Sequence, residues 1–197
     1  MWPYWLVFGL ASLLALSTSP RMRLRHDGTR SLRLDPTWIA VIVGLTLMMG
    51  FRYQVGGDWW AYIRVFQTVQ FYSFEEAALR RDPGYWLLNY FAAQAGGSMV
   101  AVNLSAGAIF STGVVIFCRS LPRPWLALAV AFPFLILVVG MGFSRQGIAL
   151  GFVMIAIVAL SRGRFVWFVF WTIIASTFHQ TAIVMIALGA ASVNRDR

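Results

Sequence analysis

Long apolar segments recur along this chain and constrain its fold more than any other feature. Residues 98–118 and residues 125–141, for example, contain no charged side chain. With 59% hydrophobic residues, 12% charged residues and a mean hydropathy of +0.71, the 197-residue chain carries more apolar surface than a water-soluble core of that size can cover. We therefore expect an all-α, polytopic transmembrane helical bundle, with residues 1–197 forming a single integral membrane domain.

Eight apolar runs could form helices, and we expect about seven of them to span the membrane. The run at residues 84–95 would reach only about 18 Å as a helix, against a hydrocarbon core of about 30 Å, so we place it at the outer interface. Residues 165–192 could form one long tilted helix, but the polar residues between 176 and 181 favour a turn there. The predicted spans are residues 2–17, 37–51, 98–118, 125–141, 143–160, 165–177 and 181–192.

The order of charges around the first run predicts its orientation. No arginine precedes residues 2–17 and five follow it, whereas a cleavable signal peptide would carry its positive charge in front. We therefore expect a retained helix with its N-terminus outside, although residues 15–17 resemble a cleavage site. In this topology 11 of the 16 arginines lie on the inner side, as the positive-inside rule predicts.

The net charge and the single cysteine exclude several classes of function. The formal charge of +9 comes from arginines in short connections between apolar runs, which does not indicate nucleic acid as a partner. Cys118 has no partner for a disulfide, and no group of His, Asp and Cys has zinc spacing. We expect a function that needs neither a metal nor another cofactor.

Ionisable residues beside apolar runs are candidates for function, because lipid does not explain them. In the predicted topology, Arg52 and Asp58, then Arg145 with Gln146, and finally His179 reach the same outer face from three parts of the chain. This convergence points to one site at the non-cytoplasmic ends of the helices.

The residues from Arg52 to Tyr62 form the densest of these polar stretches. Gly56 and Gly57 permit a tight turn, and Asp58 can cap a helix that begins at Trp59, with Tyr62 one turn further along. An ordinary helix start with Trp59, Trp60 and Tyr62 in an interfacial aromatic belt explains the same residues equally well.

The other polar residues also have two interpretations. Arg145 could hold an anion, but taken alone it favours a side chain that extends outward to water. His179 could be a packing histidine or an acid or base near neutral pH. Asp82 before Pro83 is typical of a helix start with an aspartate cap.

The order of these motifs resembles the EpsG family of Wzy-like polymerases, which act in bacterial exopolysaccharide and capsule pathways. The resemblance covers most of the chain. It rests on Arg52 with Val55-Gly56-Gly57-Asp58 and Tyr62, then Asp82-Pro83-Gly84-Tyr85, then Phe143-Ser144-Arg145-Gln146-Gly147-Ile148-Ala149, and then Phe178-His179-Gln180-Thr181-Ala182.

The resemblance implies a membrane glycosyltransferase of the bacterial inner membrane. Its substrate would be a polyprenyl-diphosphate-linked oligosaccharide, and other membrane proteins of polysaccharide assembly would be its partners. Arg52 and Arg145, with Gln146, would bind the diphosphate, and either Asp58 or His179 would be the base. Trp59 and Tyr62 would offer apolar faces to the sugar rings.

Two departures from the family pattern leave other classes of protein open. The family has Glu where this chain has Asp82, and its members continue through further spans, so residues 1–197 are expected to represent an N-terminal portion. The alternatives are a non-catalytic membrane fragment and a transporter of lipid-linked sugar or another anion. A transporter would place ionisable groups near mid-membrane and show internal symmetry, and neither pattern is visible in the sequence.

Overall fold

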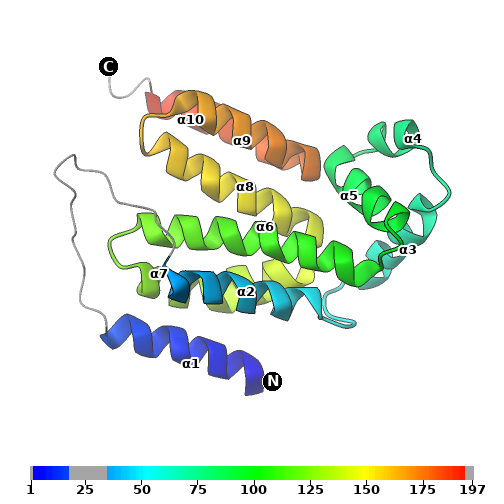
Figure 1. Ribbon diagram of the computed structural model, residues 1–197. Coiled ribbons are helices and arrows are strands. Elements are labelled where there is room, and N and C mark those ends of the chain that lie inside the picture. The colour runs from blue at the N-terminus through cyan, green and yellow to red at the C-terminus, as the bar shows by residue number, and fades with distance from the viewer. Residues whose placement is uncertain (1, 18–34, 194–197) are drawn as a thin grey trace.

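The computed structural model describes residues 2–17 and 35–193, and every regular element in those residues is helical (Figure 1). The all-α prediction is therefore confirmed for this part of the chain. The arginine-rich segment at residues 21–33 and the C-terminal Arg195 and Arg197 lie outside the described residues. The predicted excess of arginines on one side is not tested there.

Four apolar helices lie side by side and form the centre of the bundle (Figure 1). Gly113 and Gly151 face each other where two of them cross, so the two backbones touch without intervening side chains. The four helices are α2 (Pro36–Gly50), α6 (Met99–Ser120), α8 (Ser144–Leu160) and α9 (Phe165–Phe178). Gly107 of α6 packs against Met49 of α2, and Ala149 of α8 shares an apolar cluster with Ala175 of α9.

A helical segment with two kinds of hydrogen bonding returns the chain from α6 to α8. Helix α7 (Pro124–Ala131) continues directly into a wide helical segment, η1 (Phe132–Gly140), whose bonding follows the i→i+5 pattern. Pro133 in η1 has no N–H to donate, which favours such an irregularity. Helix α1 (Trp2–Ser17) packs on this segment, with the Phe8 and Phe132 ring centroids 6.0 Å apart. Its orientation across the membrane stays a prediction.

One helix among the described residues, α6, is long and apolar enough to cross a membrane by length and composition. Five further apolar helices are shorter, at 10–17 residues, so the number of seven spans stays a prediction. They are Tyr4–Ser17, Pro36–Gly50, Pro124–Gly140, Ser144–Leu160 and Phe165–Phe178.

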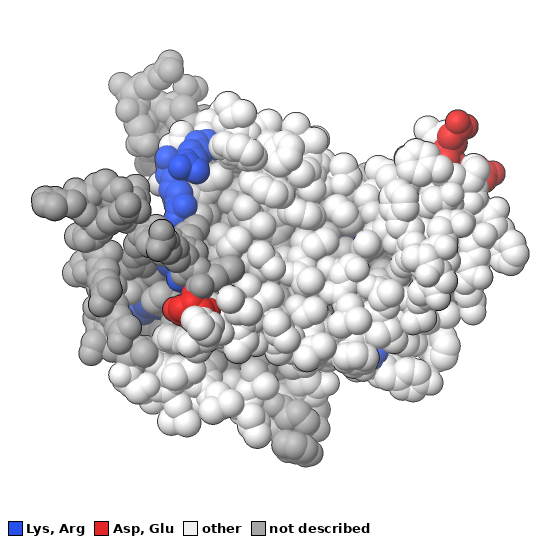
Figure 2. Space-filling view, in the orientation of Figure 1, with Lys and Arg blue, Asp and Glu red and all other residues white. Residues whose placement is uncertain are grey.

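The distribution of charge agrees with a membrane setting. On the face seen in Figure 2, the charged side chains lie toward the two ends of the bundle, and a broad uncharged surface separates them. Apolar side chains such as Val130, Phe134 and Val166 are strongly exposed on α7, η1 and α9. Such an apolar girdle matches lipid rather than water.

Three short helices lie together at one end of the bundle (Figure 1). They are α3 (Trp59–Val69), α4 (Phe74–Ala78) and α5 (Pro83–Gln94). Helix α5 has the short length expected from the sequence, and its first turn docks on the end of α9, where Gly84 leaves room for Thr177 and Phe178. Its placement at the membrane interface stays a prediction.

The chain turns sharply after α9. A short 3₁₀ segment, η2 (Gln180–Ile183), leads into α10 (Val184–Val193), which runs back so that Gly189 packs against Phe168 of α9. The predicted turn near residues 176–181 is therefore confirmed. The alternative of one long helix over residues 165–192 is wrong.

The glycine crossing of α6 and α8 gives a first prediction. A Cβ atom at Gly113 would collide with the backbone of Gly151, so Gly113→Ala must push the two helices apart. We expect a loss of about 1–3 kcal/mol in unfolding free energy, measured as a lower melting temperature in detergent. Gly44→Ala in α2 is the matched control, because no atom lies within 4 Å of a Cβ there. Equal melting temperatures for both variants would contradict close packing at this crossing.

Candidate functional site

Arg52 lies directly beyond α2 and is only 6% exposed. Its guanidinium donates to the carbonyl oxygens of Met141 and Gly140, at 3.4 Å for the latter. It also donates to Ser144 Oγ and, at 3.3 Å, to Asn103 Oδ1. One side chain therefore ties the end of α2 to α6, to the end of η1 and to the start of α8.

All of these acceptors of Arg52 are uncharged groups, so the buried guanidinium is not neutralised by them. Burial lowers the pKa of Arg52, because desolvation disfavours the charged form. An arginine keeps its proton even so, and the group remains a cation. Its Nε–H is buried without a hydrogen-bond partner. Its role as a diphosphate ligand stays a prediction, and its observed contacts are structural.

The loop after Arg52 is shaped by one of its two glycines. Gly56 has φ +95°, and a Cβ there would lie 2.6 Å from the carbonyl oxygen of Gly142, so the loop packs directly on the turn that precedes α8. Gly57 has open space around it. The tight turn predicted from the sequence thus requires glycine at one position rather than two.

Asp82 lies at the centre of the site, although the sequence predicted only a helix cap. Helix α5 does begin at Pro83, as expected, but Asp82 has a left-handed backbone with φ 59°, and its side chain does not cap the helix. Its Oδ2 accepts from Arg145 Nη1 at 3.3 Å, and its Oδ1 accepts from the backbone N–H of Gln180 at 3.2 Å. The capping prediction is wrong because both oxygens bind partners from distant parts of the chain.

Arg145 lies in the first turn of α8, and its side chain is 37% exposed. The guanidinium pairs with Asp82 and lies 5.8 Å from the ring centroid of Tyr62 and 6.0 Å from that of Tyr85. The interpretation of a lone arginine extending to water therefore does not hold. The group is held from three sides and still has N–H donors available to a ligand.

Two buried tyrosines lie near both arginines of the site. The ring centroids of Tyr62 and Tyr85 lie 5.4 Å apart, and both side chains are almost completely buried. Burial raises the pKa of both hydroxyls above the ordinary value, so they stay neutral and can donate hydrogen bonds. The hydroxyl of Tyr85 is buried, and the side chain of Asn89 acts on it.

The other predicted site residues lie at the start of α3, at the start of α8 and directly after α9. Asp58 directly precedes α3 but makes no capping hydrogen bond, so that part of the prediction is wrong, and its charge acts on the Tyr62 hydroxyl. His179 ends α9 and is half-buried, one residue before the N–H that binds Asp82. Gln146 is exposed beside Arg145, and Trp59 is buried with its ring 5.8 Å from that of Tyr53.

Sequence reasoning missed several residues that complete the site. Asp82 and Tyr85 stood inside a recognised motif, but no binding role was assigned to them. Asn103 and Ser144 bind Arg52 from two apolar runs, and polar residues in such runs were the available signal. Among the described residues, no group of three or more His, Cys, Asp or Glu side chains could hold a metal ion.

The fold and the site define the class of protein: an all-helical membrane protein with a buried arginine and a carboxylate–arginine pair at one end of its bundle. The model of the EpsG family matches residues 37–195, so the chain belongs to that family. The family resemblance inferred from the motifs is confirmed. A comparison with curated proteins found no match, and a comparison with solved structures also found none.

The contacts of Arg52 give the second prediction. Arg52→Met should leave several buried acceptors without a donor, at about 1–3 kcal/mol for each unsatisfied group, and so lower the melting temperature in detergent markedly. Arg64→Met, at an exposed position of α3, is the control and should melt close to the wild type. If both variants melted alike, Arg52 would not hold these segments together.

Proposed function

We propose that the protein polymerises lipid-linked oligosaccharide repeat units in exopolysaccharide or capsule biosynthesis. Membership of the EpsG family supports this theme. The single observation that carries the proposal is the position of Arg145. It lies at the N-terminal end of α8, is partly exposed, and is held by Asp82 and by two tyrosine rings.

The proposed reaction transfers the growing sugar chain away from its polyprenyl diphosphate. A hydroxyl of the next lipid-linked unit attacks the anomeric carbon, a new C–O bond forms, and the C–O bond to the diphosphate breaks. The hydroxyl proton passes to a base, and the diphosphate leaves as an anion. Catalysis therefore asks for donors on the leaving group and for a base near the attacking oxygen.

The electrostatics of the site favour the diphosphate. Two guanidinium groups, Arg52 and Arg145, share the surroundings of Tyr62 and Tyr85, and the carboxylate of Asp82 offsets one of the charges. The N-terminal end of α8 adds its own partial positive charge. The planar fork of Arg145 is suited to two phosphate oxygens, with Gln146 exposed next to it.

The base is proposed to be Asp58 or His179. Asp58 acts electrostatically on Tyr62, and His179 adjoins the N–H that Asp82 accepts. The aromatic side chains of Trp59 and Tyr62 are proposed to contact sugar. Both side chains are buried in this structure. In this proposal the site faces the outside of the bacterial inner membrane, in a multi-pass chain with its N-terminus outside.

The third prediction tests the polymerase directly. In a host that lacks its own polymerase but supplies the lipid-linked repeat, the wild type should give a ladder of polymer sizes. Arg145→Ala should reduce long polymer by about 100-fold or more, because the leaving diphosphate loses its main donor. Arg162→Ala, at the other end of α8, is the control and should leave the ladder intact.

The same assay can contradict the proposal in two ways. Protein levels in the membrane must be equal for all variants, so that a lost ladder reports activity rather than folding. An intact ladder with Arg145→Ala would exclude the proposed role of Arg145. Single repeats only, from an inserted wild-type chain, would exclude polymerase activity of residues 1–197 on that repeat.

A further inference from the structure

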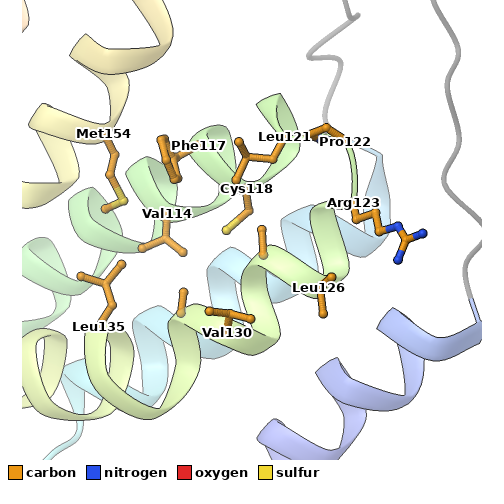
Figure 3. A pocket seen from close by; sticks show the side chains of 12 residues that line it. Val114, Phe117, Cys118, Leu121, Pro122, Arg123, Leu126, Val130, Leu135 and Met154 are labelled. Atoms are coloured by element: carbon orange, nitrogen blue, oxygen red, sulfur yellow. The ribbon is translucent and has the colours of Figure 1, made fainter.

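An apolar groove lies at the end of the bundle opposite the candidate site. It has a volume of about 510 Å³ and runs between the last turns of α6 and helix α7 (Figure 3). Phe117 and Cys118 lie on the α6 side, and Leu126 and Val130 lie on the α7 side. Arg123 is the one charged residue among the twelve that line the groove.

The groove exists because α7 does not pack on α6 as closely as α8 does. The glycine crossing at Gly113 brings the α8 backbone against α6, whereas the connection to α7 passes through Pro122 and Pro124. Side chains from both helices line this space (Figure 3). Water molecules in this apolar space would find few hydrogen-bond partners. An apolar ligand is therefore favoured there.

We propose that this groove binds one acyl chain of an anionic phospholipid, with the phosphate of its headgroup on Arg123. Val130 is 72% exposed beside the groove, so the groove opens on the girdle that faces lipid. A single cation at one end of an apolar channel matches an amphiphile with one anionic head.

The charge of this end of the bundle supports an anionic rather than a neutral lipid. Among the described residues, one arginine directly precedes α7, and two more lie between α8 and α9. The one acidic residue at this end of the described helices is Asp35, and its carboxylate accepts from the N–H of Trp38. These arginines are Arg123, Arg162 and Arg164. An anionic head complements these positive charges better than a zwitterionic head does.

A phospholipid fits this groove better than the proposed polymerase substrate does. The substrate diphosphate is assigned to Arg145, at the other end of α8, so its head cannot also lie on Arg123. The lipid site is therefore separate from the proposed reaction, and its test does not depend on polymerase activity.

The test uses native mass spectrometry of the purified full chain, titrated with lipid in detergent. The probes are phosphatidylglycerol, phosphatidylcholine with the same acyl chains, polyprenyl monophosphate, and free glycerol 1-phosphate. The variants are Arg123→Ala for the headgroup and Ala127→Phe for the groove, with Ala131→Phe as a second filling variant on the same side. Arg162→Ala is the charge control, and Val166→Phe is the control for an added ring outside the groove.

We expect one tightly retained phosphatidylglycerol per chain, several-fold above phosphatidylcholine. Arg123→Ala should remove that preference, either filling variant should remove the retained lipid, and both controls should behave as the wild type. The proposal would be overturned by equal retention of the two phospholipids, or by unchanged retention in Arg123→Ala or in a folded filling variant. Stronger binding of polyprenyl phosphate, or equal binding of glycerol 1-phosphate, would overturn it as well.

Discussion

One buried carboxylate joins the parts of this chain that otherwise lie far apart in sequence. Asp82 is 3% exposed, and its two oxygens accept from Arg145 at the start of α8 and from the N–H of Gln180 beyond α9. A buried carboxylate is stable only with such partners. Because α5 begins immediately after Asp82, the same contacts dock the short helices α3 to α5 on the end of the bundle, and the site forms at that junction.

The two arginines of the site differ in their tasks. Arg52 is buried, and its N–H groups donate to the carbonyls, amide oxygen and hydroxyl that connect α2, α6 and α8. The loss of Arg52 therefore lowers the stability of the fold. Arg145 is partly exposed and held by one ion pair, so its remaining donors can meet a ligand. A preorganised, partly exposed cation suits an anionic ligand, which is the role proposed for Arg145.

Much of the fold could be predicted from the sequence, whereas the side-chain pairing could not. Apolar runs predicted most of the long helices to within one or two residues, as with residues 143–160 against Ser144–Leu160, because the hydrophobic pattern is a local property. The cap roles of Asp58 and Asp82 were wrong, since partners 63 and 98 residues away decide where the Asp82 carboxylate binds. The glycine crossing and the acceptors of Arg52 are long-range contacts of the same kind. The convergence of the polar motifs was predictable, because successive antiparallel helices bring every second connection to the same end of the bundle.

The most direct test of the account is the affinity of the site for its anion. The full chain in lipid nanodiscs would be titrated with polyprenyl diphosphate, for the wild type, Arg145→Gln and the control Arg162→Gln. The account predicts that Kd rises at least about tenfold in Arg145→Gln, which is a loss of about 1.4 kcal/mol, and stays within about twofold in the control. An unchanged Kd in a folded Arg145→Gln protein would contradict the assignment of Arg145 to the diphosphate.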